Sequence, residues 1–141
     1  MENSLEVAAL LGSPCPLIVA EARDEESLLR AIRTHAGRQE LQVWIWSGLS
    51  GLSRDGHTTE YGTSGLPGAL ARIREVPGPA FFVLCGAVGL LTNPLTLRRL
   101  DDTVRSLEPG QTVVVQCPDG DVPAALTALA EDSVSAASSA D

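Results

Sequence analysis

The chain alternates short apolar runs with stretches in which apolar residues recur every three or four positions. The short runs have the length and composition of buried strands, and they cover residues 17–20, 41–46, 80–84 and 112–116. The periodic stretches predict amphipathic helices at 4–11, 24–36, 67–76, 94–107 and 123–131. The clearest apolar stripe belongs to the fourth helix, at Leu97, Leu100, Val104 and Leu107.

Strands that alternate with helices predict an α/β fold in three layers, with a mostly parallel sheet of four to five strands and helices on both faces. Right-handed crossovers then bring the strand-to-helix loops to one edge of the sheet, where sites of α/β proteins lie. We therefore expect any site to fall within residues 20–24, 47–65, 85–93 and 117–122. The glycine-rich loop 47–65 is unusually long, which is typical of a functional or a mobile loop.

The length of 141 residues indicates one domain. We expect an N-terminal helical segment at 1–13, a single α/β domain at 14–131 and a tail at 132–141. The tail is rich in Ser and Ala, and we expect it to be disordered.

All ten basic residues are arginines, because the sequence contains no lysine. A phosphate-binding loop of the G-x-x-x-x-G-K-[ST] type requires a lysine, so the fold is predicted to be P-loop-like without a P-loop. The acidic helix start Asp24-Glu25-Glu26 is typical of a capped helix and repels anions where such a loop would bind them. A Mg²⁺ site is the alternative there, although nothing supplies the phosphate that usually shares the ion. We expect neither a metal nor a cofactor.

The net charge of −8 and the pI near 4.6 disfavour nucleic acid or an anionic membrane as the partner. No apolar run approaches the ~20 residues of a membrane span, and the first residues lack the basic region of a signal peptide. The odd set Cys15, Cys85 and Cys117, without a C-x-x-C pair, indicates reduced thiols in a cytoplasm. Arginine in place of lysine is typical of a GC-rich genome, and we expect a bacterial protein.

One residue is a candidate for catalysis. Cys85 follows a buried strand, where a thiol is placed to act as a nucleophile with His35 or His57 as its base. The alternative is that Cys85 is a small buried side chain beside a glycine-shaped turn.

Seven residues are candidates for contact with a protein partner: Trp44, Trp46, Arg54, His57, Tyr61, Arg98 and Arg99. The two tryptophans point to the same face of their strand, which fits either core packing or a docking patch. The next three lie in the loop 47–65, which is either solvated or used for recognition. The last two lie on a helix face, where the pairs Arg98–Asp102 and Asp101–Arg105 can form at i,i+4 on the solvent side.

Five motifs follow one another across about residues 16–130. They are Asp24-Glu25-Glu26; Trp46-Ser47-Gly48-Leu49-Ser50-Gly51-Leu52; Pro67-Gly68-Ala69-Leu70-Ala71-Arg72-Ile73; Arg98-Arg99-Leu100-Asp101-Asp102; and Cys117-Pro118 followed by Val122-Pro123-Ala124-Ala125-Leu126. In this order they resemble the N-terminal domain of a AAA+ ATPase family first noticed as a conserved hypothetical reading frame of plastids and cyanobacteria. Cys85-Gly86-Ala87-Val88 departs from the family, which has an Asp-aromatic-His segment there.

The resemblance implies an accessory α/β domain and does not imply ATPase activity, which belongs to a separate C-terminal domain of the family. We therefore predict a non-catalytic adaptor or regulatory subunit that works by protein–protein interaction. Its partner would be a separate AAA+ ATPase or a multi-subunit assembly, and a homo-oligomer stays open. The alternatives are a small enzyme that uses Cys85 and a nucleotide sensor that binds without hydrolysis.

Overall fold

The computed structural model describes residues 16–21, 23–118 and 122–139. Five strands in these residues form one sheet in the order β1-β5-β4-β2-β3. They are β1 (Leu17–Glu21), β2 (Gln42–Ser47), β3 (Gly51–Arg54), β4 (Ala80–Leu84) and β5 (Gln111–Cys117). Neighbouring strands are parallel except for the antiparallel pair of β2 and β3. The predicted mostly parallel sheet is confirmed, and each predicted strand agrees within one residue at either end.

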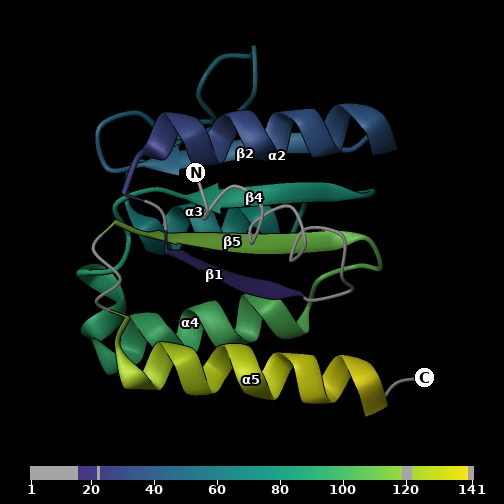
Figure 1. Ribbon diagram of the computed structural model, residues 1–141. Coiled ribbons are helices and arrows are strands. Elements are labelled where there is room, and N and C mark those ends of the chain that lie inside the picture. The colour runs from purple at the N-terminus through teal and green to yellow at the C-terminus, as the bar shows by residue number, and fades with distance from the viewer. Residues whose placement is uncertain (1–15, 22, 119–121, 140–141) are drawn as a thin grey trace.

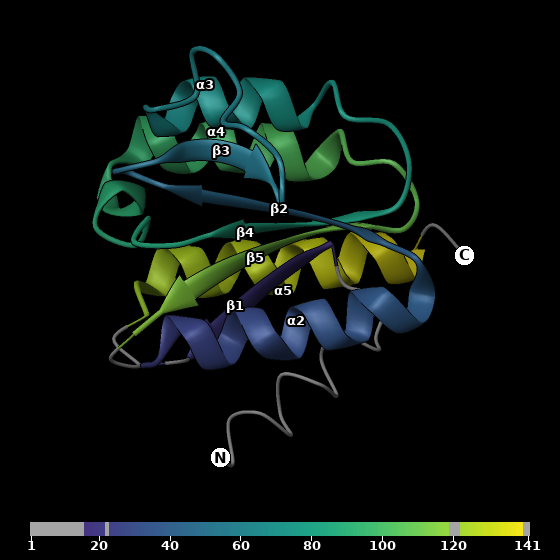
Figure 2. The same cartoon turned by 90° about the horizontal axis from the view of Figure 1, so that it is seen from above.

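Helices cover both faces of the sheet (Figure 1). One face carries α2 (Glu25–Gln39) and the other carries α3, α4 and α5. The view from above shows α3 and α4 on the opposite side of the sheet from α2 (Figure 2). These three are α3 (Leu66–Ile73), α4 (Pro94–Arg105), which follows the short 3₁₀ turn η1 (Leu90–Thr92), and α5 (Ala124–Ser139). The predicted helix at 4–11 and Cys15 lie outside the described residues.

The sheet separates two apolar cores because successive side chains of a strand point to opposite faces. In β4, Phe82 and Leu84 pack under α3 and α4, whereas Phe81 and Val83 pack under α2. Every residue of β4 is buried, as expected for a central strand covered on both sides. The predicted stripe of α4 is confirmed, since Leu100 and Val104 are buried and Leu97 and Leu107 pack against the same core.

Three predicted helix ends were wrong, and one of them is that of α3, which ends at Ile73 and not at residue 76. Helix α2 continues past Gly37 to Gln39, because an interior glycine costs only about 1 kcal/mol and Glu40 ends the helix instead in the left-handed conformation, with φ 55°. Helix α5 runs to Ser139, so most of the predicted disordered tail is helical. Alanine is the strongest helix former, and the alanines of this stretch favour continuation of the helix.

The prediction that residues 47–65 lack secondary structure was also wrong. Residues 51–54 form β3, which pairs with β2 in a hairpin. The sequence hides this strand because only Leu52 is a large apolar residue and Gly51 has a positive φ of 72°. Pairing with β2 supplies the stability that the local sequence lacks.

Candidate functional site

The carboxyl ends of β1, β5, β4 and β2 lie at one edge of the sheet, at the left of Figure 1. This edge is where the sequence places any functional site. We call it the carboxyl edge. Its connections are the start of α2, the β2–β3 turn, the residues between β4 and α4, and the residues after β5.

The start of α2 is capped by its own side chains. The Asp24 carboxylate accepts hydrogen bonds from the Glu26 amide at 3.1 Å and from the Ser27 hydroxyl at 2.7 Å. The hydrogen bond from Ser27 is the main reason that the pKa of Asp24 lies below its usual value. Internal carboxylates therefore take the place that an anion occupies at the helix start of a phosphate-binding fold. Within the described residues, no group of three His, Cys, Asp or Glu side chains has the arrangement of a metal site.

Cys85 has the properties of a structural thiol. It is buried, and burial raises the pKa of its thiol to about 12, helped by the negative charge of Glu25 and by a hydrogen bond to that carboxylate. Cys117 is buried too, and its pKa is raised to about 11 by burial and then by Glu21. A nucleophilic cysteine needs the opposite shift, toward the thiolate at neutral pH.

Neither histidine lies beside Cys85. His35 makes an edge contact with Phe81, with ring centroids 5.7 Å apart, and Phe81 lies four positions before Cys85, or about 13 Å along the strand. His57 lies in the turn after β3, and its amide donates to the Arg54 carbonyl at 2.8 Å. The structure therefore does not bring together the pair that the enzyme alternative requires.

The two candidate tryptophans are core side chains. Trp44 is 7% exposed and Trp46 is 1% exposed, and both face the core under α3, as their alternation in the strand predicts. Of the two alternatives that the sequence left open, core packing therefore applies to both tryptophans. Their burial leaves neither ring accessible to a partner.

Besides bonds to the neighbouring strand β3 and its turn, such as that from the Thr59 hydroxyl to the Ser50 carbonyl at 2.9 Å, three sets of contacts join the β3–α3 segment, residues 55–65, to the rest of the fold. At its start, Asp55 accepts two hydrogen bonds from the Arg33 guanidinium on α2, at 2.8 and 3.0 Å. Near its end, Thr63 is buried, and its hydroxyl accepts from the Leu52 amide at 2.9 Å and donates to the Glu60 carbonyl at 2.7 Å. The Trp46 indole donates to the Thr63 carbonyl at 2.9 Å.

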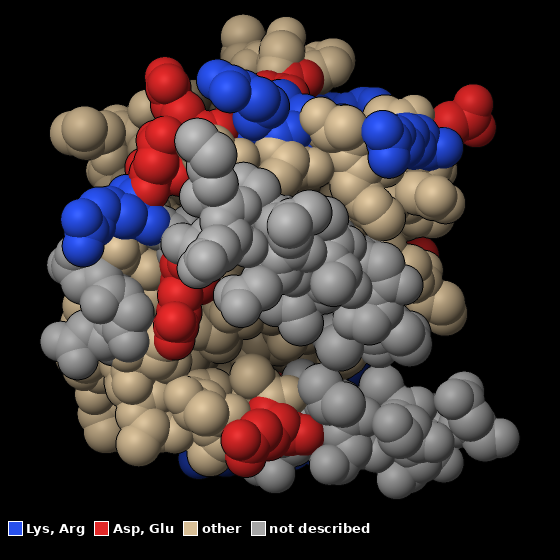
Figure 3. Space-filling model, viewed as in Figure 1, with Lys and Arg blue, Asp and Glu red and all other residues tan. Residues whose placement is uncertain are grey.

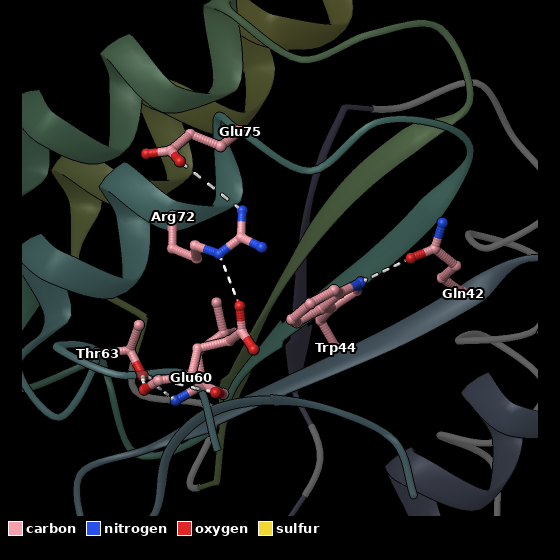
Figure 4. A network of polar contacts seen from close by, with 7 residues as sticks. Gln42, Trp44, Glu60, Thr63, Arg72 and Glu75 are labelled. Carbon is pink, nitrogen blue, oxygen red and sulfur yellow. Dashed lines mark hydrogen bonds and ion pairs between the residues drawn. The ribbon is translucent and has the colours of Figure 1, made fainter. Parts of the chain in front are cut away.

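The third attachment is an ion pair on a tryptophan ring (Figure 4). Glu60 accepts a hydrogen bond from Arg72 of α3 at 2.8 Å, and both side chains are about one-third exposed. The Arg72 guanidinium also lies over the Trp44 ring, 5.9 Å from its centroid, in a cation–π arrangement. The Trp44 indole donates in turn to Gln42 at 3.0 Å.

Three of the candidate partner residues therefore lie on or next to a fixed segment. Arg54 ends β3, His57 follows it, and Tyr61 lies between the two attachments at Glu60 and Thr63; all three side chains are exposed. Tyr61 is exposed over its whole surface, at 103%. An exposed aromatic on a backbone that is attached on both sides suits a binding surface.

The other two candidates, Arg98 and Arg99, lie on the exposed face of α4. Helix α3 packs against both β3 and α4, the helix that carries these arginines. Asp101 pairs with Arg105 at 2.9 Å as predicted, but the expected pair of Arg98 with Asp102 is not formed among the described residues.

Sequence reasoning missed two groups of residues. The attachments made by Thr63 and Arg72 join positions far apart in the chain, so no local pattern indicates them. The exposed leucines 49, 90 and 95 were missed because apolar residues in or near regular elements are usually predicted to lie in the core. The one available signal was the absence of charged residues from 41–53 and from 85–97.

None of the helices within the described residues combines the length and the apolar character that a membrane crossing requires. A family model described as the N-terminal domain of SpoVK-like AAA ATPases matches residues 3–132. No curated protein and no solved structure matches the chain. The family match confirms the resemblance to an AAA ATPase N-terminal domain that the five motifs indicated.

Proposed function

The chain belongs to the family of SpoVK-like AAA ATPase N-terminal domains, and from this premise we propose that it is a non-catalytic protein–protein interaction domain. It serves as an adaptor or regulatory part of a larger assembly that contains an AAA ATPase. The reduced-thiol composition supports a cytoplasmic protein, and the exclusive use of arginine as the basic residue supports a bacterial one. The finer likeness to the plastid and cyanobacterial proteins rests on the five motifs alone.

The observation that carries this proposal is the fixed presentation of Tyr61. Its ring is fully exposed, while the residues on either side of it are attached by Glu60–Arg72 and by buried Thr63. Tyrosine is enriched among residues that dominate binding energy. A backbone segment held in place before binding loses less conformational entropy when a partner covers it. Arg54 and His57 extend the same surface.

The contacts at the carboxyl edge weigh against the two alternatives. A sensor would need donors for phosphate, but at the start of α2 the negatively charged Asp24 carboxylate already accepts from the Glu26 amide and the Ser27 hydroxyl. An enzyme would need a thiolate, but burial raises the pKa of Cys85 to about 12. Calorimetry with Mg-ATP and Mg-GTP tests the first point, and we expect no heat of binding at millimolar nucleotide. A micromolar dissociation constant would establish the sensor instead.

The partner surface is tested with Tyr61→Ala and Arg54→Ala. Capture from extract of the native cell, with mass spectrometry, identifies the partner for the measurement. We expect each substitution to weaken association by about 1–3 kcal/mol if the residue is an anchor. Stability should change by less than about 0.5 kcal/mol, because both side chains are exposed.

Tyr61→Phe is the matched control, since it keeps the ring and removes only the hydroxyl. Hydrogen exchange then locates the contact. Residues 55–65 should exchange more slowly in the complex than in the free protein. Equal exchange in both states would move the partner surface away from this segment.

A further inference from the structure

Three exposed leucines lie in the connections at the carboxyl edge. Leu49 is 100% exposed in the β2–β3 turn, Leu90 is 47% exposed in η1, and Leu95 is 61% exposed in the first turn of α4. The connections that carry them follow β2 and β4, which are neighbours in the sheet, and the Cys85 amide donates to the Trp46 carbonyl at 2.9 Å where the two strands end. Figures 1 and 2 both show these connections at the same end of the molecule. We call the three residues the edge leucines.

The backbone that presents the edge leucines is held in place. Leu91 is buried between Leu90 and Leu95, and the Asn93 side chain accepts hydrogen bonds from the Leu95 amide at 2.9 Å and the Thr96 amide at 3.5 Å. In the turn, the Ser50 amide donates to the Ser47 hydroxyl at 3.1 Å. The leucines therefore remain outside the core because of the backbone around them.

The charges at this edge are divided. Residues 41–53 and 85–97, which include the edge leucines, carry no charged side chain. The connection from β1 to α2 carries four exposed carboxylates and one exposed arginine, a net of −3, from Glu21, Arg23, Asp24, Glu25 and Glu26. Figure 3 shows acidic side chains beside the start of α2, next to uncharged surface at the same end. The edge therefore has an apolar part with an acidic border.

We propose that the carboxyl edge is a docking surface for a protein segment that combines large aliphatic residues such as leucine with neighbouring lysines or arginines. The apolar side chains of the segment would cover the edge leucines, since removal of apolar surface from water is the main favourable term in such contacts. Its basic residues would face the acidic border, which fixes the direction of docking and speeds association. This surface is additional to the one around Tyr61.

The acidic border selects this occupant over two others. A second copy of the chain that docked edge to edge would bring two borders of net −3 together, because a twofold contact uses the same patch on both copies. Like charges placed opposite each other are unfavourable. An anionic lipid surface would be repelled in the same way.

The test uses the full-length protein and three synthetic peptides of equal length. One combines leucine with lysine, one replaces every lysine with glutamate, and one keeps the lysines and replaces every leucine with serine. Amide chemical shifts of the protein, followed through each titration, give both the affinity and the location of binding. We expect the leucine–lysine peptide to bind at least tenfold more tightly than either of the others and to perturb residues 47–50, 86–96 and 21–26.

Substitutions at the edge separate apolar from charge contributions. Leu90→Ser with Leu95→Ser should weaken binding of the leucine–lysine peptide about tenfold or more, and the exposed positions leave the fold intact. Glu26→Gln should weaken it about two- to fivefold, the size of an exposed ion pair. Glu131→Gln is the control for charge, because Glu131 lies exposed in α5 outside the acidic border. Tyr61→Ala should leave the affinity unchanged, which separates this surface from the one proposed above.

Each outcome decides the proposal. Equal binding of the serine–lysine peptide would mean that net charge alone attracts it. Absence of binding by the leucine–lysine peptide at millimolar concentration would remove the surface. Light scattering that shows a dimer broken by the paired leucine substitutions would identify a second copy as the occupant. Any of these three results overturns the proposal.

Discussion

Two connections leave strands β3 and β4, which lie on either side of β2 in the same sheet, yet they are held in place by different forces. The β3–α3 segment is attached by polar side chains to distant partners, namely Arg33, Arg72 and the indole of Trp46. The β4–α4 segment, residues 85–93, is held by short-range backbone hydrogen bonds and by the buried side chains of Ala87 and Leu91. The β3–α3 segment should therefore be destabilised by loss of a hydrogen-bond partner, and the β4–α4 segment by loss of buried volume.

The largest expected contrast concerns the thiol that opens the β4–α4 segment. The pKa of Cys85 is raised from 9.0 to about 12, so at a given pH below 9 its thiolate fraction is about a thousandfold smaller than in the unfolded chain. Labelling of Cys85 in the folded protein should be slower by at least that factor. Time-resolved alkylation with peptide mapping measures it. Rapid labelling near neutral pH would contradict the burial of this thiol.

The same pKa shift predicts how stability depends on pH. Between about pH 9 and pH 12 the unfolded state has lost the proton of Cys85 while the folded state still keeps it. The contribution of Cys85 to the free energy of unfolding is therefore fully present below pH 9 and is lost as the pH rises from about 9 to about 12. Cys117 adds a loss of the same sign between about 9 and 11. Replacement of Cys85 by Ala should flatten the alkaline part of the stability profile.

Truncation of one core side chain at each connection sharpens the contrast between polar and apolar attachment, and both side chains belong to the core under α3 and α4. Trp46→Ala should cost about 3–5 kcal/mol and Leu91→Ala about 2–5 kcal/mol, because both leave cavities. Trp46→Phe keeps most of the volume but leaves the Thr63 carbonyl without its donor, at a cost of about 1–3 kcal/mol. Urea unfolding measures all three. If Trp46→Phe were neutral, the polar attachment would contribute nothing to the β3–α3 segment.

One glycine in each region can be replaced by alanine, and the two replacements should change stability in opposite directions. A Cβ at Gly68 would clash with the carbonyl oxygen of Gly62, where the β3–α3 segment passes over the start of α3. Gly68→Ala should therefore destabilise by about 1–3 kcal/mol. Gly89 has a helical φ of −62° and open space around it, so Gly89→Ala should stabilise by up to about 1 kcal/mol. Thermal melting of both variants is the measurement, and shifts of the same sign would contradict the difference in packing.

The smallest expected effect is that of the Glu60–Arg72 pair. Both side chains are about one-third exposed, so Glu60→Gln should cost less than about 1 kcal/mol, and added salt should reduce the difference. The amides of residues 55–65 should lose more protection from hydrogen exchange than the loss of global stability explains, because the pair attaches this segment in particular. An equal loss of protection across the molecule would mean that the pair stabilises the whole fold and not this segment.

The sequence predicted most of the architecture because the buried strands and the apolar stripe of α4 follow local periodicity. It missed β3, whose pairing with β2 is decided by tertiary contacts and whose own residues, apart from Leu52, are polar or glycine. For the site, Arg54, His57 and Tyr61 were predicted as exposed loop residues and lie exposed at one segment. The contacts that fix this segment join Leu52 to Thr63 and Glu60 to Arg72, and such pairings leave no trace in a periodic pattern.

The protein has two tryptophans, and both lie where the β3–α3 segment meets the sheet. Trp46 donates its indole hydrogen to that segment, and Trp44 lies under the guanidinium that holds Glu60. Intrinsic fluorescence is therefore a local optical reporter of this region, with no signal from the α2 side of the sheet. A red shift of emission at a denaturant concentration below that of the helical circular dichroism transition would reveal detachment of the segment before global unfolding. The same emission would also follow partner binding around Tyr61 without any added label.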